Sequence, residues 1–86
     1  MQNQITIKPD QNKNYNHVDL ALLDHGFIFE SKFLGAKNAV GNSKTYRVYW
    51  NGQDYYYLDN YDHFNGTVYS VRVKVLPNPL GHYQEV

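Results

Sequence analysis

Apolar and polar residues alternate along most of the chain, a pattern that predicts β-strands. Residues 4–8 alternate with Ile5 and Ile7 on one side, and residues 27–34 form a second predicted strand. Because the side chains of a strand point alternately to its two faces, the second strand has one strongly apolar face. That face carries Phe27, Phe29, Ser31 and Phe33. The following stretch, 35–43, contains two glycines and no periodicity, which predicts a loop.

Residues 17–25 fit two structures. Asn16 is a suitable N-cap and Gly26 a suitable C-terminal stop, and together they predict a short helix. Alternate residues from Val18 to Leu22 also fit a strand. The two terminus signals, and the lack of a β-branched run after Val18, favour the helix.

Two Asn-Gly pairs, at positions 51–52 and 65–66, predict two β-hairpins in the second half of the chain. Asn-Gly favours a two-residue turn, because both turn positions need a positive φ. Such a turn at the first pair places Tyr55 opposite Val48 and puts the largest apolar groups of both strands on one face. These groups are Tyr46, Val48, Trp50, Tyr55 and Tyr57.

The loop length of the second hairpin decides which face its valines occupy. A two-residue loop puts Val73 and Val75 on the face opposite Val48, because a slip of one residue exchanges the two faces of a strand. A three-residue loop, 64–66, puts them on the same face as Val48. We expect the three-residue loop, because all the large apolar groups then share one core.

The face opposite this predicted core collects basic and aromatic side chains from three strands. The candidate binding residues on it are Arg47, Tyr49, Tyr56, Arg72 and Lys74. Tyr and Arg are enriched in protein–protein hot spots. Aromatic and guanidinium groups also stack on nucleic-acid bases. A third interpretation is a solvated face on which long basic side chains lie over tyrosine rings.

Together these elements predict an α+β fold, in which one short helix packs on an antiparallel sheet of four to five strands in the order β-α-β-β-β-β. The chain of 86 residues is short enough for one domain, so we expect residues 1–86 to form a single domain. Residues 1–3 and 77–86 are expected to be peripheral tails. In the second tail, Pro77 and Pro79 cannot continue a strand ladder because they lack an N–H donor.

The composition narrows the possible chemistry. Eight Lys and Arg residues balance eight Asp and Glu residues, which argues against a protein that coats DNA. Without cysteine there is no disulfide, thiolate zinc site or cysteine nucleophile. The four histidines fall on no metal-ligand spacing, and no Gly-rich phosphate loop is present. We therefore expect no metal, no cofactor and no catalytic residue.

The sequence does not indicate a membrane protein. No apolar run approaches the roughly 20 residues of a membrane helix, and the first residues do not resemble a signal peptide. We expect a cytoplasmic protein without a membrane partner. Because a core this small stabilises a fold by only a few kcal/mol, a homodimer through a sheet edge is one partner hypothesis.

The leading hypothesis is a small non-enzymatic binding protein that acts by occupying a site on a larger macromolecule, with a protein as the expected partner. Small chains of this kind are frequent among phage and mobile-element inhibitors of host nucleic-acid-targeting machinery, such as anti-CRISPR proteins, and only this frequency supports that role. The alternative is a small RNA- or single-stranded-DNA-binding protein that uses the Tyr/Arg face. A third hypothesis is a metal-free, toxin-type ribonuclease that uses groups such as His25 and His63.

Overall fold

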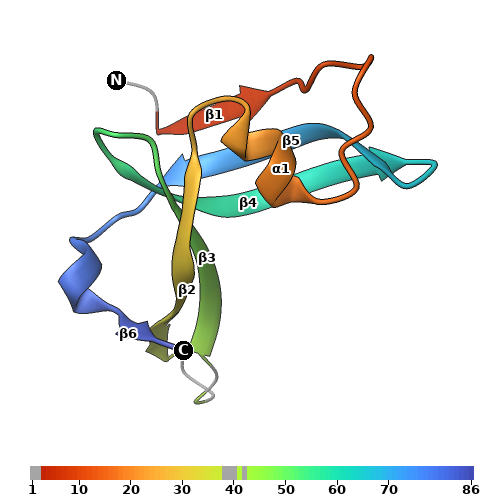
Figure 1. Ribbon diagram of the computed structural model, residues 1–86. Helices are drawn as coiled ribbons and strands as arrows, with labels where there is room; N and C mark the ends of the chain where they lie inside the picture. Colours follow the sequence, from red (N-terminus) through yellow and green to blue (C-terminus); the bar gives the residue numbers. More distant parts are fainter. Residues whose placement is uncertain (1–2, 38–40, 42) are drawn as a thin grey trace.

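A computed structural model describes residues 3–37, 41 and 43–86 of the chain. Its strands are β1 (Gln4–Ile7), β2 (Ile28–Lys37), β3 (Ser43–Trp50), β4 (Tyr55–Phe64), β5 (Thr67–Val75) and β6 (Gln84–Glu85), and its helices are α1 (Val18–Leu23) and the 3₁₀ turn η1 (Leu80–His82). The strands form one antiparallel sheet in the order β1-β5-β4-β3-β2-β6, with α1 against one face (Figure 1). The predicted α+β fold is confirmed, and within the described residues the sheet has six strands instead of four or five.

The sheet consists of two halves that meet where β3 and β4 pair. These two strands pair at only three positions beside their shared connection, whereas β4 and β5 pair along nearly all their length. In Figure 1, β1, β4 and β5 run across the view, and β2 and β3 run downward from them. As a result β3 is buried on both faces, with Val48 in one apolar cluster and Tyr49 in another.

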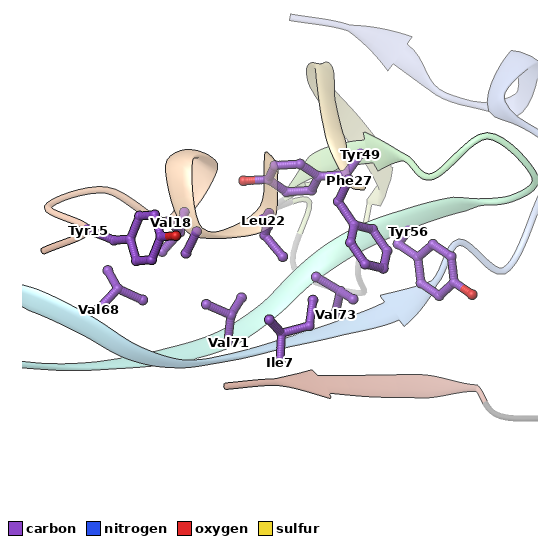
Figure 2. Packing of buried hydrophobic residues seen from close by; sticks show 11 residues of the cluster. Ile7, Tyr15, Val18, Leu22, Phe27, Tyr49, Tyr56, Val68, Val71 and Val73 are labelled. Carbon is purple, nitrogen blue, oxygen red and sulfur yellow. The ribbon is translucent and has the colours of Figure 1, made fainter. Parts of the chain in front are cut away.

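The main cluster lies between α1 and the half of the sheet formed by β1, β5 and β4. In Figure 2, Val18 lies above Val68 and Leu22 lies above Val71. Phe27 contacts the ring of Tyr56 edge-on, with the ring centres 5.3 Å apart. The buried members of the main cluster are Ile7, Tyr15, Val18, Ala21, Leu22, Phe27, Tyr49, Tyr56, Val68, Val71 and Val73. Burial of this apolar surface is the main source of stability for the fold.

A second cluster lies on the opposite face, where the C-terminal segment covers β2, β3 and β4. It contains Phe33, Val48 and Leu76, with Tyr46, Tyr55, Tyr57, Leu80 and Tyr83 packed against it. Beyond η1, strand β6 pairs with β2 at the edge of the sheet. The prediction that residues 77–86 are a peripheral tail is therefore wrong. The prolines end β5, as expected, but the chain then returns to the sheet.

The boundaries of α1 differ slightly from the predicted helix over residues 17–25. The N-cap is His17 instead of Asn16, and its Nδ1 atom accepts a hydrogen bond from the backbone N–H of Asp19 at 3.1 Å. Gly26 follows the helix with a φ of +86°, which is the left-handed conformation that favours glycine after a helix. The helix interpretation is confirmed over Val18–Leu23.

Both hairpins form, but both predicted registers are wrong. The first hairpin has a four-residue connection, because Trp50 pairs with Tyr55 and the Asn51 side chain accepts hydrogen bonds from the backbone N–H groups of Gln53 and Asp54. This shift of two residues leaves each side chain on its predicted face. The second hairpin has a two-residue turn instead of the expected three-residue loop, because Phe64 pairs with Thr67.

The register of the second hairpin reverses the predicted face of the valines. Tyr56 pairs with Val75 and Leu58 with Val73, so these valines share a face with Tyr56 and not with Val48. The three-residue loop was expected on the assumption that the molecule has one core. The structure has a core on each face, so the assumption fails.

Strand β2 also changes face along its length. Phe29 pairs with Tyr49, but Ser31 pairs with Val48, so Glu30 is an extra residue in the strand. Such a bulge exchanges the two faces beyond it. Phe33 consequently lies in the second cluster, although the sequence pattern predicted one face for Phe27, Phe29 and Phe33. The strand continues to Lys37, into the stretch predicted as a loop.

Candidate binding site at the end of a β-hairpin

The five predicted binding residues do not form one exposed surface. Tyr49 is fully buried and Tyr56 is almost fully buried, both in the main cluster. The prediction that they lie on an open sheet face is wrong, because α1 and Phe27 cover that face (Figure 2). Arg47 lies on the same face as Tyr49, while Arg72 and Lys74 lie on the opposite one.

Arg47 helps to attach α1 to β3. Its guanidinium forms a bidentate ion pair with the Asp19 carboxylate and lies over the ring of Phe29, with Cζ 4.2 Å from the ring centre. The hydroxyl of Tyr49 donates to the same carboxylate at 2.5 Å. Only 23% of the Arg47 side chain is exposed. Arg47 is therefore committed to an internal contact.

The electrostatics of this contact follow from partial burial and strong pairing. Burial raises the pKa of Asp19, but the hydrogen bonds from Arg47 and Tyr49 outweigh this effect, so the pKa lies below its ordinary value. Burial, and then the bond to Asp19, raise the pKa of Tyr49, so the phenol stays protonated and remains a donor. The Asp19 carboxylate is thus held in its charged form.

Arg72 and Lys74 are also paired. Arg72 Nε lies 2.5 Å from Asp59 Oδ2, and Lys74 Nζ lies 3.6 Å from Asp59 Oδ1. The hydrogen bond from Arg72 is the main reason that the pKa of Asp59 lies below its ordinary value. Because exposed pairs are weak, these two basic residues still present some positive surface, but without the tyrosines predicted beside them.

Most of the exposed Phe and Tyr residues that the structure describes lie elsewhere, at the far end of the β4–β5 hairpin, although Phe29 on β2 is also 37% exposed. Phe64 is 71% exposed, Tyr61 is 43% exposed and Tyr69 is 38% exposed. His63 lies beside Tyr61, with the ring centres 6.1 Å apart. In Figure 1 the turn that joins the two strands lies at the right-hand extremity of the molecule. We call residues 60–70 the hairpin end.

A type I′ turn and a bulge in β5 define the backbone of the hairpin end. Asn65 and Gly66 have φ angles of +52° and +76°, the pair of left-handed conformations that a type I′ turn requires. On β5, Ser70 pairs with Asp62 and Val68 pairs with His63, so Tyr69 is an extra residue. Bulges of this kind redirect a side chain. Here the bulge places Tyr69 beside Phe64 and Thr67.

A hollow lies on each side of the hairpin end. The one towards α1 has a volume of about 260 Å³ and is lined by Asn16, His17, Val18, Tyr61, His63, Gly66 and Val68. The one on the opposite face, a wider groove of about 460 Å³, is lined by Lys8, Gln11, Phe64, Thr67 and Tyr69. The strand pair therefore presents aromatic side chains on both of its faces, each beside a concave surface.

The structure does not bring together His25 and His63, the two histidines named in the ribonuclease hypothesis. His63 lines the hollow next to α1 together with His17, whereas His25 lies after α1 with its Nδ1 atom 3.1 Å from the carbonyl oxygen of Ala21. Among residues 3–37, 41 and 43–86, no group of three or more His, Cys, Asp or Glu side chains is placed to hold a metal ion. No described helix is long and apolar enough to cross a membrane.

Comparison of the chain with protein-family models, with curated proteins and with solved structures gives no match. Any functional assignment must therefore come from the surface of the molecule itself.

The sequence does contain a signal for the hairpin end. An Asn-Gly turn lies between Tyr61, His63 and Phe64 on one side and Tyr69 on the other, and period-2 alternation cannot bury all of these on one face.

Proposed function

We propose that this chain is a non-enzymatic binding protein that acts by occupying a site on a larger protein, and that the hairpin end forms the contact. The observation that carries the proposal is the exposure of Phe64, a large apolar side chain next to the Asn65-Gly66 turn. An exposed phenylalanine loses contact with water when it inserts into a pocket, and a fixed turn reduces the entropy cost of its insertion.

The surroundings of Phe64 support a protein partner. Interfaces between proteins have an aromatic centre with few charges and a polar rim. On the face of the hairpin end away from α1, the centre consists of Phe64 and Tyr69, with the polar residues Gln11 and Thr67 beside them. Tyr61 lies on the other face, in the hollow that Asn16 also lines. The arrangement matches an interface of the protein–protein type.

A nucleic-acid partner has less support. The basic residues of the predicted Tyr/Arg face are paired with Asp19 or Asp59, and its two tyrosines, Tyr49 and Tyr56, are buried. Affinity for nucleic acid falls steeply with added salt because counterions are released, whereas contact through aromatic groups depends little on salt. The salt dependence of binding therefore distinguishes the two partners.

The test compares Phe64→Ala with Leu23→Ala. Leu23 is 55% exposed on α1, outside the hairpin end, so it controls for the loss of an exposed apolar side chain. The tagged chain is used to isolate its partner from nuclease-treated host extract, the partner is identified by mass spectrometry, and its affinity is measured with purified components. We expect Phe64→Ala to weaken binding by about 30-fold or more, equivalent to about 2 kcal/mol.

Both variants should melt at the temperature of the wild type, because neither side chain is buried. Equal affinities for Phe64→Ala and the wild type would contradict the proposal. If the partner is a nucleic-acid-targeting defence complex of the host, as the frequency of small phage inhibitors suggests, the wild-type chain should also inhibit its activity, and Phe64→Ala should not.

A further inference from the structure

The residues that line the groove beside Phe64 limit the kinds of partner segment that can bind there. Its walls are two aromatic rings, Phe64 and Tyr69, and the side chains of Gln11 and Thr67 complete it. A planar or aliphatic side chain of a partner that packs against Phe64 and Tyr69 in this groove loses contact with water. The groove is wide and open, so it suits a protruding side chain of a protein more than an enclosed small molecule.

Lys8 supplies the only positive charge of the groove. It follows β1 directly and is exposed. Several other basic residues have carboxylate partners, such as Arg47 with Asp19 and Lys13 with Asp24. Within the part of the chain that the structure describes, no acidic side chain forms an ion pair with Lys8. No acidic residue lines the groove either.

We propose that this groove binds a segment of the partner protein that presents an aromatic or large apolar side chain beside a carboxylate. The apolar side chain packs against Phe64 and Tyr69, and the carboxylate accepts a hydrogen bond from the Lys8 ammonium group. This proposal rests on the proposed function, since it names the chemistry that the hairpin end recognises. A nucleotide is the competing occupant, because a base and a phosphate also combine a flat ring with negative charge.

The experiment uses three small probes and requires no knowledge of the partner. N-acetyl-tryptophan carries an indole ring and a carboxylate, and N-acetyl-tryptophanamide is the same molecule without the charge. Uridine monophosphate represents a nucleotide. Each is titrated into the isotope-labelled 86-residue chain to about 10 mM, a range suited to weak single-site contacts, and backbone amide shifts are followed by NMR.

The expected result is that the carboxylate probe moves the amide signals of Lys8, Gln11, Thr67 and Tyr69 and binds about three- to fivefold more tightly than its amide, the range of one exposed ion pair. Lys8→Gln should remove this preference, since glutamine keeps a polar side chain but no charge. Lys44→Gln, which changes a lysine that lies over Tyr46 and Tyr57 instead, should leave it intact.

Three outcomes would overturn the inference: equal affinities of the two tryptophan probes for the wild-type chain, the absence of shifts at the groove residues, or tighter binding of uridine monophosphate than of N-acetyl-tryptophan. The proposed function is judged separately by the affinity of Phe64→Ala for the isolated partner. A chain that needs Phe64 for its partner but shows no preference for the carboxylate probe would lose only the further inference.

Discussion

Tyr56→Ala should lower the free energy of unfolding by about 3 kcal/mol or more, the range for removing a large side chain from a core. The Tyr56 side chain is almost fully buried, and its ring contacts Phe27 edge-on within the main cluster. Its removal leaves a cavity under Phe27 and beside Val73 (Figure 2). Urea unfolding followed by tryptophan fluorescence measures the loss.

The matched control is Tyr56→Phe, which keeps the ring and removes only the hydroxyl group. We expect it to unfold close to the wild-type midpoint. The exposed-face prediction made from the sequence implies the opposite behaviour for Tyr56→Ala, namely little loss of stability. An unchanged midpoint for Tyr56→Ala would therefore contradict the register of β4 and β5 in which Tyr56 pairs with Val75.

Asp19→Ala should destabilise the fold by about 2–3 kcal/mol. The carboxylate of Asp19 accepts hydrogen bonds from Arg47 and Tyr49, and its loss leaves a half-buried guanidinium and a buried phenol without their partner. Breaking a fully buried ion pair costs more, about 3–5 kcal/mol. The lower value applies here because about a quarter of each side chain in the pair is exposed. Asp54→Ala, in the exposed connection between β3 and β4, is the control.

The same contact predicts a dependence of stability on pH. The pKa of Asp19 is lower in the folded chain than in the unfolded chain, so its contribution is complete above the ordinary carboxyl pKa of about 4. That contribution is lost as the pH falls through the lower pKa of the folded state. Unfolding midpoints of the wild type should therefore fall more steeply below about pH 4 than those of Asp19→Ala. Parallel pH profiles would show that the ion pair does not contribute.

Local signals in the sequence predict the first strand, the helix and the two hairpins of the fold, but not η1 and β6. The alternation around Ile5 and Ile7, the short helix before Gly26 and the two Asn-Gly turns all appear in the structure. Each depends on backbone preferences of a few neighbouring residues. The antiparallel sheet with one helix follows from these elements.

The arrangement of the faces could not be predicted in the same way. The bulges at Glu30, Asp59 and Tyr69 each exchange the faces of a strand, and no local pattern marks them. The second cluster depends on the return of Leu80 and Tyr83 to the sheet, a contact between residues distant in sequence. A single core implies a register of β4 and β5 that differs from the observed one. It therefore predicts that the face with Tyr49 and Tyr56 is exposed, although the structure buries it.

The difference between the predicted and the observed register explains why the predicted binding residues do not form one exposed surface. Tyr49 and Tyr56 belong to the core, and Arg47 belongs to the contact between α1 and β3. The sequence pattern predicts Phe64 in a three-residue loop, although it is the most exposed of the large apolar side chains that the structure describes.

The most direct test of the central claim is to detect which residue touches the partner. Phe64 is replaced by the photoreactive residue p-benzoylphenylalanine, which is also an aromatic side chain, and Leu23 is replaced in the same way in a second variant. Each variant is mixed with the isolated partner and irradiated, and the cross-linked products are identified by mass spectrometry. The hairpin-end interface predicts a cross-link to the partner from position 64 and little or none from position 23. A cross-link from position 23 alone, with none from position 64, would show that the partner binds over α1 and would contradict the claim.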